Sequence, residues 1–255
     1  MKIHRFIDNF DLSKKELEIS GDIAYQIIKV LKFEVGEKIE LGDGKGTVGF
    51  GKVKSIGKGT VLVGIERIEK VEENKKTTLF CAVLKKENFE LVVQKATECG
   101  VSKIVPIITS RTIKTGLNLG RLQKIAKEAS EQSGRGTVPE ILEPISFEKS
   151  LKIVDKNNLN ILFDISGELF YKKHCAGWRA EHSNLPAGKY ARFLEDNSPQ
   201  NLFIGPEGGW TEEEIKKVYP SSGVARDADF KIYSLGNLTL RAETAAIVAT
   251  YLSTN

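Results

Sequence analysis

The chain has 255 residues, 40% of them hydrophobic and 28% charged, which is typical of a soluble globular protein and excludes a largely disordered chain. The formal net charge of +4 is compatible with a nucleic-acid partner but too small to indicate one. The three cysteines are odd in number and have no paired spacing, which argues against a disulfide framework and predicts a cytoplasmic protein. No apolar run has the length of a signal peptide or a membrane span, so we expect no membrane partner.

The first seventy or so residues are predicted to be rich in short β-strands. Alternating apolar patterns occur at 47–53 and 60–65 among frequent glycines. Turn sequences separate them, Asp-Gly at 43–44 and Gly-Lys-Gly at 57–59. A small β-barrel, over residues 1–72, is the expected solution.

One helix is predicted in this part, over residues 22–31. Ile23 and Ile27 lie on one face of it at helical spacing, together with Val30 or Leu31. The spacing leaves open which of the last two residues faces the core.

A polar segment at 69–77 is predicted to be a linker, and a second domain, over residues 73–255, follows it. Strand and helix patterns alternate in this domain. In chain order we expect a strand at 79–84, a helix at 87–99, a strand at 103–108, a helix around 122–129, strands at 160–163 and 201–204, and a last helix at 241–252. Such alternation predicts an α/β fold with a parallel sheet flanked by helices.

Some helix ends in the second domain have specific signals. Gly100 and Gly134 stand where helices are predicted to end. Thr211, with Glu214 three residues later, forms a capping-box sequence that predicts another helix start. Residues 167–199 show no clean period and are interpreted as loop and irregular helix.

Two predicted strands end in glycine-rich loops, FIGPEGGW at 203–210 and SLGNLTLR at 234–241. Ligands of parallel sheets bind beyond the carboxyl ends of the strands, where glycine lets the backbone approach a ligand closely. One such loop would be a tight connection and no more. Two in one sheet, each followed by a helix, predict a ligand site.

Several kinds of chemistry are excluded by the motifs. No P-loop and no G-x-S-x-G nucleophile sequence occurs, and the G-x-G-x-x-G match at 44–49 lies among short strands and is interpreted as a hairpin. His4, His174 and His182 have no zinc-site spacing, so we expect no metal. A direct transfer between two bound substrates fits these absences.

Four segments, in the same order along the chain, resemble motifs of the RsmE family of SPOUT-class RNA methyltransferases. They are VQKATECGVSKIV at 93–105, IAKEASEQSGRGTVPEI at 125–141, NLFIGPEGGW at 201–210 and LGNLTLRAETAA at 235–246. The resemblance covers nearly the whole chain. It implies methylation of N3 of a uridine in 16S ribosomal RNA of the small subunit.

The same resemblance implies a SPOUT-type α/β domain with a trefoil knot at the C-terminus, after a PUA-like β-barrel that holds RNA. It also implies a homodimer with S-adenosyl-L-methionine bound between the two glycine loops. The positions that match the family's cofactor residues are Ile204, Gly205, Glu207, Gly208, Leu235, Gly236 and Leu240.

Arg241 is the candidate catalytic residue. Uracil N3 must lose a proton as it accepts the methyl group, and a fixed cation could stabilise the developing negative charge. Arg241 could instead merely form an ion pair with Glu243 or Glu207, but its place in the family's motif favours the catalytic interpretation. Glu98 and Glu207 are candidates for accepting the proton, and for each of them an ion pair with a lysine is an equal alternative.

Two stretches are basic enough to suggest phosphate contacts. Residues 44–65 include four lysines and no acid, and residues 103–135 have seven basic residues against two acidic ones. Basic positions of the family's motifs are matched by Lys85, Lys95, Arg111 and Arg135. The chain lacks the family's histidine and arginine at 25–32 and a basic residue at Asn88.

Two other functions stay open at this point. An enzyme with the same fold and cofactor could act on a tRNA or another ribosomal position. A protein whose cofactor pocket has decayed could bind RNA, or assist ribosome assembly, without catalysis.

Overall fold

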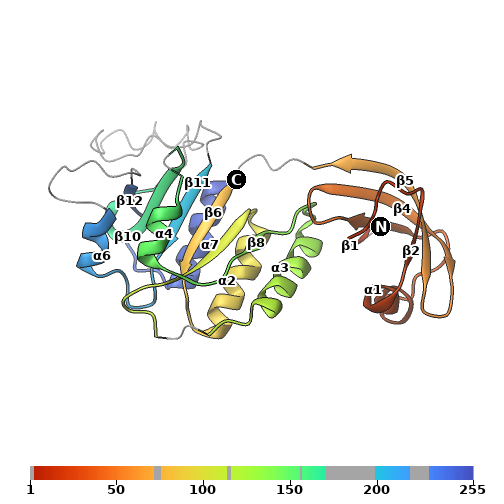
Figure 1. Cartoon of the computed structure of the whole chain (residues 1–255), viewed down its shortest axis with the longest axis horizontal. Helices are drawn as coiled ribbons and strands as arrows, with labels where there is room; N and C mark the ends of the chain where they lie inside the picture. Colours follow the sequence, from red (N-terminus) through yellow and green to blue (C-terminus); the bar gives the residue numbers. More distant parts are fainter. Residues whose placement is uncertain are drawn as a thin grey trace. The chain divides into compact units, whose positions relative to one another are not determined.

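In a computed structural model of the chain, the residues described are 3–71, 76–113, 116–155, 157–170, 199–218 and 230–254. They divide into two compact units. The first contains Met1–Glu73 and Ala126–Val138, and the second contains Asn74–Ile125 and Pro139–Asn255. The first unit thus includes a piece of chain from far beyond residue 72. Figure 1 shows the strands and helices of both units.

The first unit is built on a five-stranded sheet. Its strands are β1 (His4–Ile7), β2 (Glu16–Ile19), β3 (Lys38–Gly42), β4 (Thr47–Ile56) and β5 (Val61–Lys70). The strand order is β1-β3-β4-β5-β2, with β1 and β3 parallel and the other pairs antiparallel. The sequence predicts a small β-barrel here, and in the described residues β1 and β2 are the two ends of the strand order.

The predicted turn between β3 and β4 is confirmed. The Asp43 carboxylate accepts the backbone N–H groups of Lys45 (2.7 Å) and Thr47 (2.9 Å), and Gly44 has a φ of 71°, which favours glycine. The G-x-G-x-x-G match at 44–49 lies in this turn and the start of β4, and it opens no helix.

The predicted first helix is confirmed, but its second half is wider than an α-helix. α1 (Gly21–Tyr25) continues as the π-helix η1 (Gln26–Val30). Ile27 is fully buried, Leu31 packs against the core, and Val30 is 61% exposed. The structure therefore assigns the core-facing position to Leu31.

Two carboxylates, one buried and one half-buried, join three segments of the first unit. Arg5 of β1 donates to both oxygens of Glu40 (2.5 and 2.7 Å), whose side chain is almost fully buried in β3. Glu131, from α3 (Leu119–Ser133), accepts the backbone N–H of Ile7 at 2.8 Å. Burial raises the pKa of Glu131 above its ordinary value of 4.5, although the bond from Ile7 opposes this.

We expect Glu131→Gln to raise the thermal unfolding midpoint at pH 7 and to have less effect at pH 4. The carboxyl of Glu131 has a higher pKa folded than unfolded, so its favourable contribution is present below about pH 4.5 and lost as the pH rises through the folded value. Glutamine keeps an acceptor for Ile7 and never ionises. Circular dichroism melts at both pH values test this, with the exposed Glu18→Gln as the control. An equal shift at pH 4 and pH 7 would contradict the prediction.

The second unit contains a seven-stranded sheet, and each of its strand pairs is parallel. Its strands are β6 (Thr77–Ala82), β7 (Lys103–Ile108), β8 (Glu140–Ile141), β9 (Ile145–Ser146), β10 (Leu159–Leu169), β11 (Gln200–Ile204) and β12 (Phe230–Ser234). The order is β12-β10-β11-β6-β7-β8, with β9 also paired to β7. This confirms the predicted parallel α/β fold.

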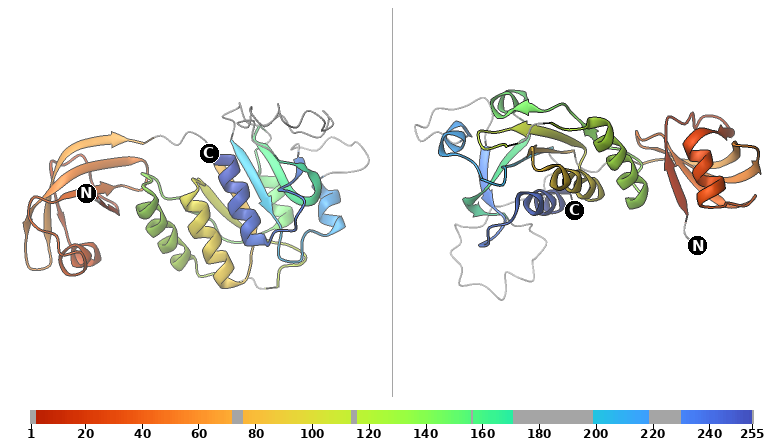
Figure 2. Two further views of the ribbon diagram at one scale, coloured as in Figure 1. Left: turned by 180° about the vertical axis from the view of Figure 1, so that it is seen from behind. Right: turned by 90° about the horizontal axis from the view of Figure 1, so that it is seen from below.

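Helices cover both faces of this sheet. They include α2 (Lys86–Glu98), α4 (Phe147–Ile153), α6 (Glu212–Val218) and α7 (Ala242–Thr254). α2 and α7 pack together on one face, and α4 and α6 lie on the other (Figure 2). Phe203 of β11 lies opposite Phe80 of β6, so both side chains point to the same face of the sheet. Their rings stack with the centroids 4.4 Å apart, and Phe147 of α4 contacts Phe203 edge-on.

The helix signals of the second domain are confirmed. α2 buries Phe89, Val92, Val93 and Ala96 on one face, as the spacing predicted, and ends before Gly100, whose φ is 103°. Cys81 and Cys99 form no disulfide bond within the described residues. Within the described ranges, no helix is both long and apolar enough to cross a membrane.

The sequence predicts loop and irregular helix at 167–199, but Gly167 to Leu169 form the last part of β10. The next residue, Phe170, donates its backbone N–H to the backbone oxygen of Ser234 in β12 at 2.8 Å. Residues 171–198, with His174, Cys175 and His182, lie outside the described residues, as do residues 72–75 of the predicted linker.

Candidate ligand-binding site

A pocket of about 290 Å³ lies where β11 and β12 end and beside the irregular middle of β10, the strand between them in the parallel sheet. The middle of β10, both glycine loops and the first turns of α7 supply its lining. The lining residues are Phe163, Asp164, Ile165, Ile204, Gly205, Pro206, Glu207, Gly208, Gly209, Trp210, Ser234, Leu235, Leu238, Thr239, Leu240, Ala242 and Ala245. Ligands of parallel sheets bind at this edge.

The first glycine loop is closely packed around one indole ring. Trp210 is 6% exposed, and its Nε1 donates to the backbone oxygen of Phe163 at 3.0 Å. A Cβ atom on Gly205 would lie only 3.0 Å from that indole. Glycine at 205 therefore lets the tryptophan bind β10 at Phe163 and hold two walls of the pocket together.

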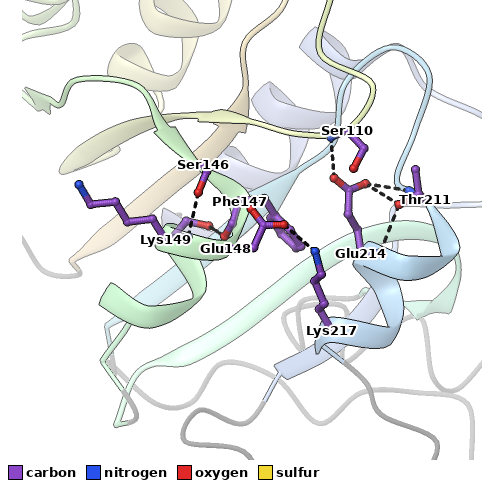
Figure 3. A network of polar contacts seen from close by, with 9 residues as sticks. Ser110, Ser146, Phe147, Glu148, Lys149, Thr211, Glu214 and Lys217 are labelled. Atoms are coloured by element: carbon purple, nitrogen blue, oxygen red, sulfur yellow. Dashed lines mark hydrogen bonds and ion pairs between the residues drawn. The ribbon is translucent and has the colours of Figure 1, made fainter.

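The start of α6 fixes the end of this loop, and the predicted capping box is confirmed. Glu214 is 1% exposed and accepts the backbone N–H and the hydroxyl of Thr211, whose hydroxyl in turn accepts the Glu214 N–H. The other oxygen of Glu214 accepts the backbone N–H of Ser110 at 2.8 Å (Figure 3). On the solvent side of α6, Lys217 forms an ion pair with Glu148 of α4.

The second glycine loop turns immediately after β12. The Ser234 hydroxyl donates to the backbone oxygen of Gly236 (2.7 Å), and Gly236 has a φ of 146°, in the range that favours glycine. Leu238, further along the loop, lines the pocket and is nevertheless 80% exposed. The loop thus gives the pocket an apolar edge open to solvent.

Strand β10 is irregular where it meets the pocket. Its register with β12 shifts between Phe163 and Glu168, and the Asp164 carboxylate accepts the N–H and the hydroxyl of Ser166 within the bulge. A Cβ on Gly167 would come within 2.7 Å of the β12 backbone. Bulges of this kind occur next to active sites, where they redirect side chains.

The titratable residues of the lining are Asp164 and Glu207, and both are acidic. Glu207 also accepts the backbone N–H of Lys85, at the start of α2, at 3.3 Å. Beneath the pocket, burial raises the pKa of the Cys81 thiol, and the charges of Glu207 and Glu243 raise it further. The pocket therefore favours a cationic ligand over a phosphate.

Six of the seven residues predicted to bind a cofactor line this pocket: Ile204, Gly205, Glu207, Gly208, Leu235 and Leu240. Gly236 lies in the second loop but is not among the lining residues. Arg241 lies outside the lining; its side chain is 85% exposed and approaches Glu243 at 3.9 Å, as the alternative interpretation allowed.

The four residues predicted to contact RNA have different surroundings within their own units. Lys95 forms an ion pair with Glu98, so the alternative interpretation of Glu98 as a lysine partner is confirmed. Arg111 donates to backbone oxygens of the first glycine loop. Lys85 precedes α2 in the second unit, and Arg135 donates to Thr137 in the first unit.

Sequence reasoning missed the wall that β10 supplies, Phe163, Asp164 and Ile165. The rule that identified the two glycine loops could have found it, because Asp164 directly follows a predicted buried strand. Across the described ranges no group of three or more histidine, cysteine or acidic side chains is placed to hold a metal ion.

The chain matches two family models. Residues 71–253 match the RNA methyltransferase domain, and residues 27–66 match the RNA methyltransferase PUA domain. The chain is 32% identical to the ribosomal RNA small subunit methyltransferase E of Rickettsia conorii over 252 residues, which cover 98% of this chain and 94% of that protein. It is 27% identical to the protein of that name from Bacillus subtilis, with 94% and 92% covered.

A solved structure has the same fold over nearly the full length. The ribosomal RNA small subunit methyltransferase E of Neisseria gonorrhoeae, bound to S-adenosyl methionine, superimposes with a TM-score of 0.79 at 27% identity. The match covers 98% of this chain and 95% of that one. Because the methyltransferase model spans most of the chain and the relatives match it end to end, the chain belongs to the RNA methyltransferase family and, within it, to the ribosomal RNA small subunit methyltransferase E (RsmE) proteins.

Proposed function

We propose that this chain transfers the methyl group of S-adenosyl-L-methionine to N3 of a uridine in 16S ribosomal RNA. The observation that carries the proposal is the pocket at the carboxyl ends of β11 and β12, beside the bulge of β10. Its titratable lining groups, Asp164 and Glu207, are both acids, which suits a cationic sulfonium and disfavours a nucleotide phosphate.

The lining fits the cofactor chemically. Two glycine loops offer backbone groups at close range, and Ile204, Leu235 and Leu240 offer apolar contacts. Together with Gly205, Glu207, Gly208 and Gly236 these are the residues that would hold S-adenosylmethionine. The bound cofactor supplies a methyl group already activated by its sulfonium, so the work of the protein is to position the acceptor and stabilise its charge.

Arg241 is suited to that second task. It directly precedes α7, and its backbone oxygen accepts the N–H of Ala245, which itself lines the pocket. Its guanidinium is solvent-exposed and only loosely held by Glu243 at 3.9 Å, so it can turn toward a bound base. There it stabilises the negative charge that develops on the uracil oxygens as N3 loses its proton.

RNA binding is divided between two domains in this proposal. Residues 1–72 form the PUA-like RNA-binding domain and residues 73–255 the methyltransferase domain, a division supported by the extents of the two family matches. Lys85, Lys95 and Arg135 are proposed to contact phosphates, which adds affinity without sequence choice.

We propose that the methyltransferase domain has the trefoil knot of the SPOUT class and that the chain assembles as proteins of that class do. A trefoil knot is supported by the strand order, in which β12 lies on the other side of β10 from β11, and by α7, which packs on β6 and β11. We further propose that the chain forms a homodimer in the cytoplasm. Light scattering coupled to size exclusion measures the dimer directly, and a mass of one chain at micromolar concentration would exclude it.

Calorimetry with S-adenosylmethionine tests the cofactor assignment. We expect saturable binding to the unaltered chain without RNA, because the pocket is lined by one unit alone. No detectable binding at millimolar cofactor would refute the enzyme function and leave a non-catalytic RNA-binding protein.

Mass mapping of ribosomal RNA tests the substrate. RNA from a strain that lacks the gene should have lost one N3-methyl group on a uridine of 16S RNA, and the purified chain should restore it. If that methyl group persists while another RNA loses one, the cofactor assignment stands and the substrate is wrong.

A further inference from the structure

We propose that Arg111 is a positioning residue for the cofactor pocket, which it shapes by holding the first glycine loop from outside. The inference rests on the proposed function. It assigns Arg111 a task that its match to a basic, RNA-contacting position did not suggest.

Arg111 reaches the first glycine loop from the segment that follows β7, which does not line the pocket. It lies three residues beyond β7, and its Nη1 donates to the backbone oxygen of Gly208 (2.5 Å) and to that of Trp210 (3.3 Å). The partners are 97 and 99 residues away in the sequence. One guanidinium thus binds two carbonyls on either side of Gly209.

These carbonyls belong to the turn that forms one wall of the pocket. The N–H of Gly209 donates to the oxygen of Pro206 at 2.8 Å, which closes a turn with Glu207 and Gly208 at its centre. Gly209 has a φ of 69°, so the turn depends on glycine there. Holding the Gly208 carbonyl fixes this peptide, and with it the placement of Glu207 and Gly208 in the pocket lining.

The next residue back along the chain strengthens the same attachment. The N–H of Ser110 donates to the buried carboxylate of Glu214, which also binds Thr211. Two consecutive residues after β7 therefore hold both ends of the segment from Gly208 to Glu214. A support of this kind lowers the cost of ordering the loop when a ligand binds.

The geometry of the guanidinium matters as much as its charge. Both bonds come from Nη1, whose two N–H groups are fixed in the guanidinium plane, whereas lysine is a point charge on a flexible stem. Arg111→Lys would retain most of any attraction for phosphate but would hold the two carbonyls less firmly, because its N–H groups are not fixed in one plane. This difference separates a loop-holding role from an RNA contact.

The experiment compares Arg111→Met and Arg111→Lys with Arg121→Met. Arg121 lies in the same unit, on α3, and forms an ion pair with Glu90 on α2 away from the pocket lining. Calorimetry without RNA should show both Arg111 variants binding S-adenosylmethionine about tenfold more weakly, the effect of losing a hydrogen bond to a charged group. Arg121→Met should stay within about twofold of the unaltered chain, since surface ion pairs contribute little.

RNA binding and kinetics supply the second measurement. The salt dependence of the affinity for 16S RNA should be unchanged in Arg111→Lys, and KM for S-adenosylmethionine should rise with little change in kcat. Unchanged cofactor affinity in both variants, with a shallower salt dependence in Arg111→Met, would identify an RNA contact and overturn the inference. A lower kcat with an unchanged KM would also overturn the inference, because a smaller fraction of folded protein gives that result by itself. Failure of the unaltered chain to bind the cofactor refutes the proposed function itself.

Discussion

Arg241→Ala should lower kcat by about 100- to 1,000-fold, the cost of removing one group that stabilises transition-state charge. The affinity for S-adenosylmethionine should change by less than about threefold, because the Arg241 side chain is 85% exposed and outside the pocket lining. Single-turnover kinetics with small-subunit RNA measures the first quantity and calorimetry the second.

Two variants make the Arg241 result interpretable. Arg241→Lys keeps a cation and should recover part of the lost rate, whereas Glu243→Gln removes the partner at 3.9 Å and should have a small effect if that pair is incidental. An equal loss of turnover and cofactor affinity in Arg241→Ala would make Arg241 a cofactor-binding residue instead.

Glu214→Ala should lower the stability of the second unit by about 3 kcal/mol, one of the larger effects expected of a single substitution. The Glu214 carboxylate is 1% exposed and accepts three hydrogen bonds, from the N–H of Ser110 and from the N–H and hydroxyl of Thr211. Alanine would remove the acceptor of three partly buried donors. The midpoint of thermal unfolding should fall by roughly 6–12 °C in a chain of this size.

Glu213→Ala is the matched control for Glu214, because it removes the same charge from the same helix at an exposed position. Its midpoint should lie within about 2 °C of the unaltered chain. Comparable melting of the two variants would show that the capping network has little energetic weight. Since Glu214 also holds the loop that follows β11, we expect its loss to weaken cofactor binding.

The sequence by itself determined the features that depend on residues a few positions apart. The spacing of Phe89, Val92, Val93 and Ala96 predicted the buried face of α2, and Thr211 with Glu214 predicted the start of α6. These signals are readable because a helix brings together residues three and four positions apart. The alternation of strands and helices likewise predicted the parallel sheet.

Local pattern was insufficient where a wider helix or an irregular strand formed. The sequence left Val30 and Leu31 as alternatives, and the π-helical turn placed Leu31 against the core and Val30 in solvent. The lack of a clean period also predicted a loop at Gly167, whereas β10 continues past its bulge and this residue lies in the strand beside Tyr233. Both outcomes depend on packing against distant segments, which no local period encodes.

Only the tertiary structure decided which residues meet at the pocket. The order β12-β10-β11 places Asp164 of β10 beside both glycine loops, although strand order cannot be read from three short apolar runs. The same holds for Arg111, whose carbonyl partners lie about a hundred residues further along the chain. Composition and spacing indicate that an arginine is basic, but the fold determines whether its donors bind a phosphate or a backbone oxygen.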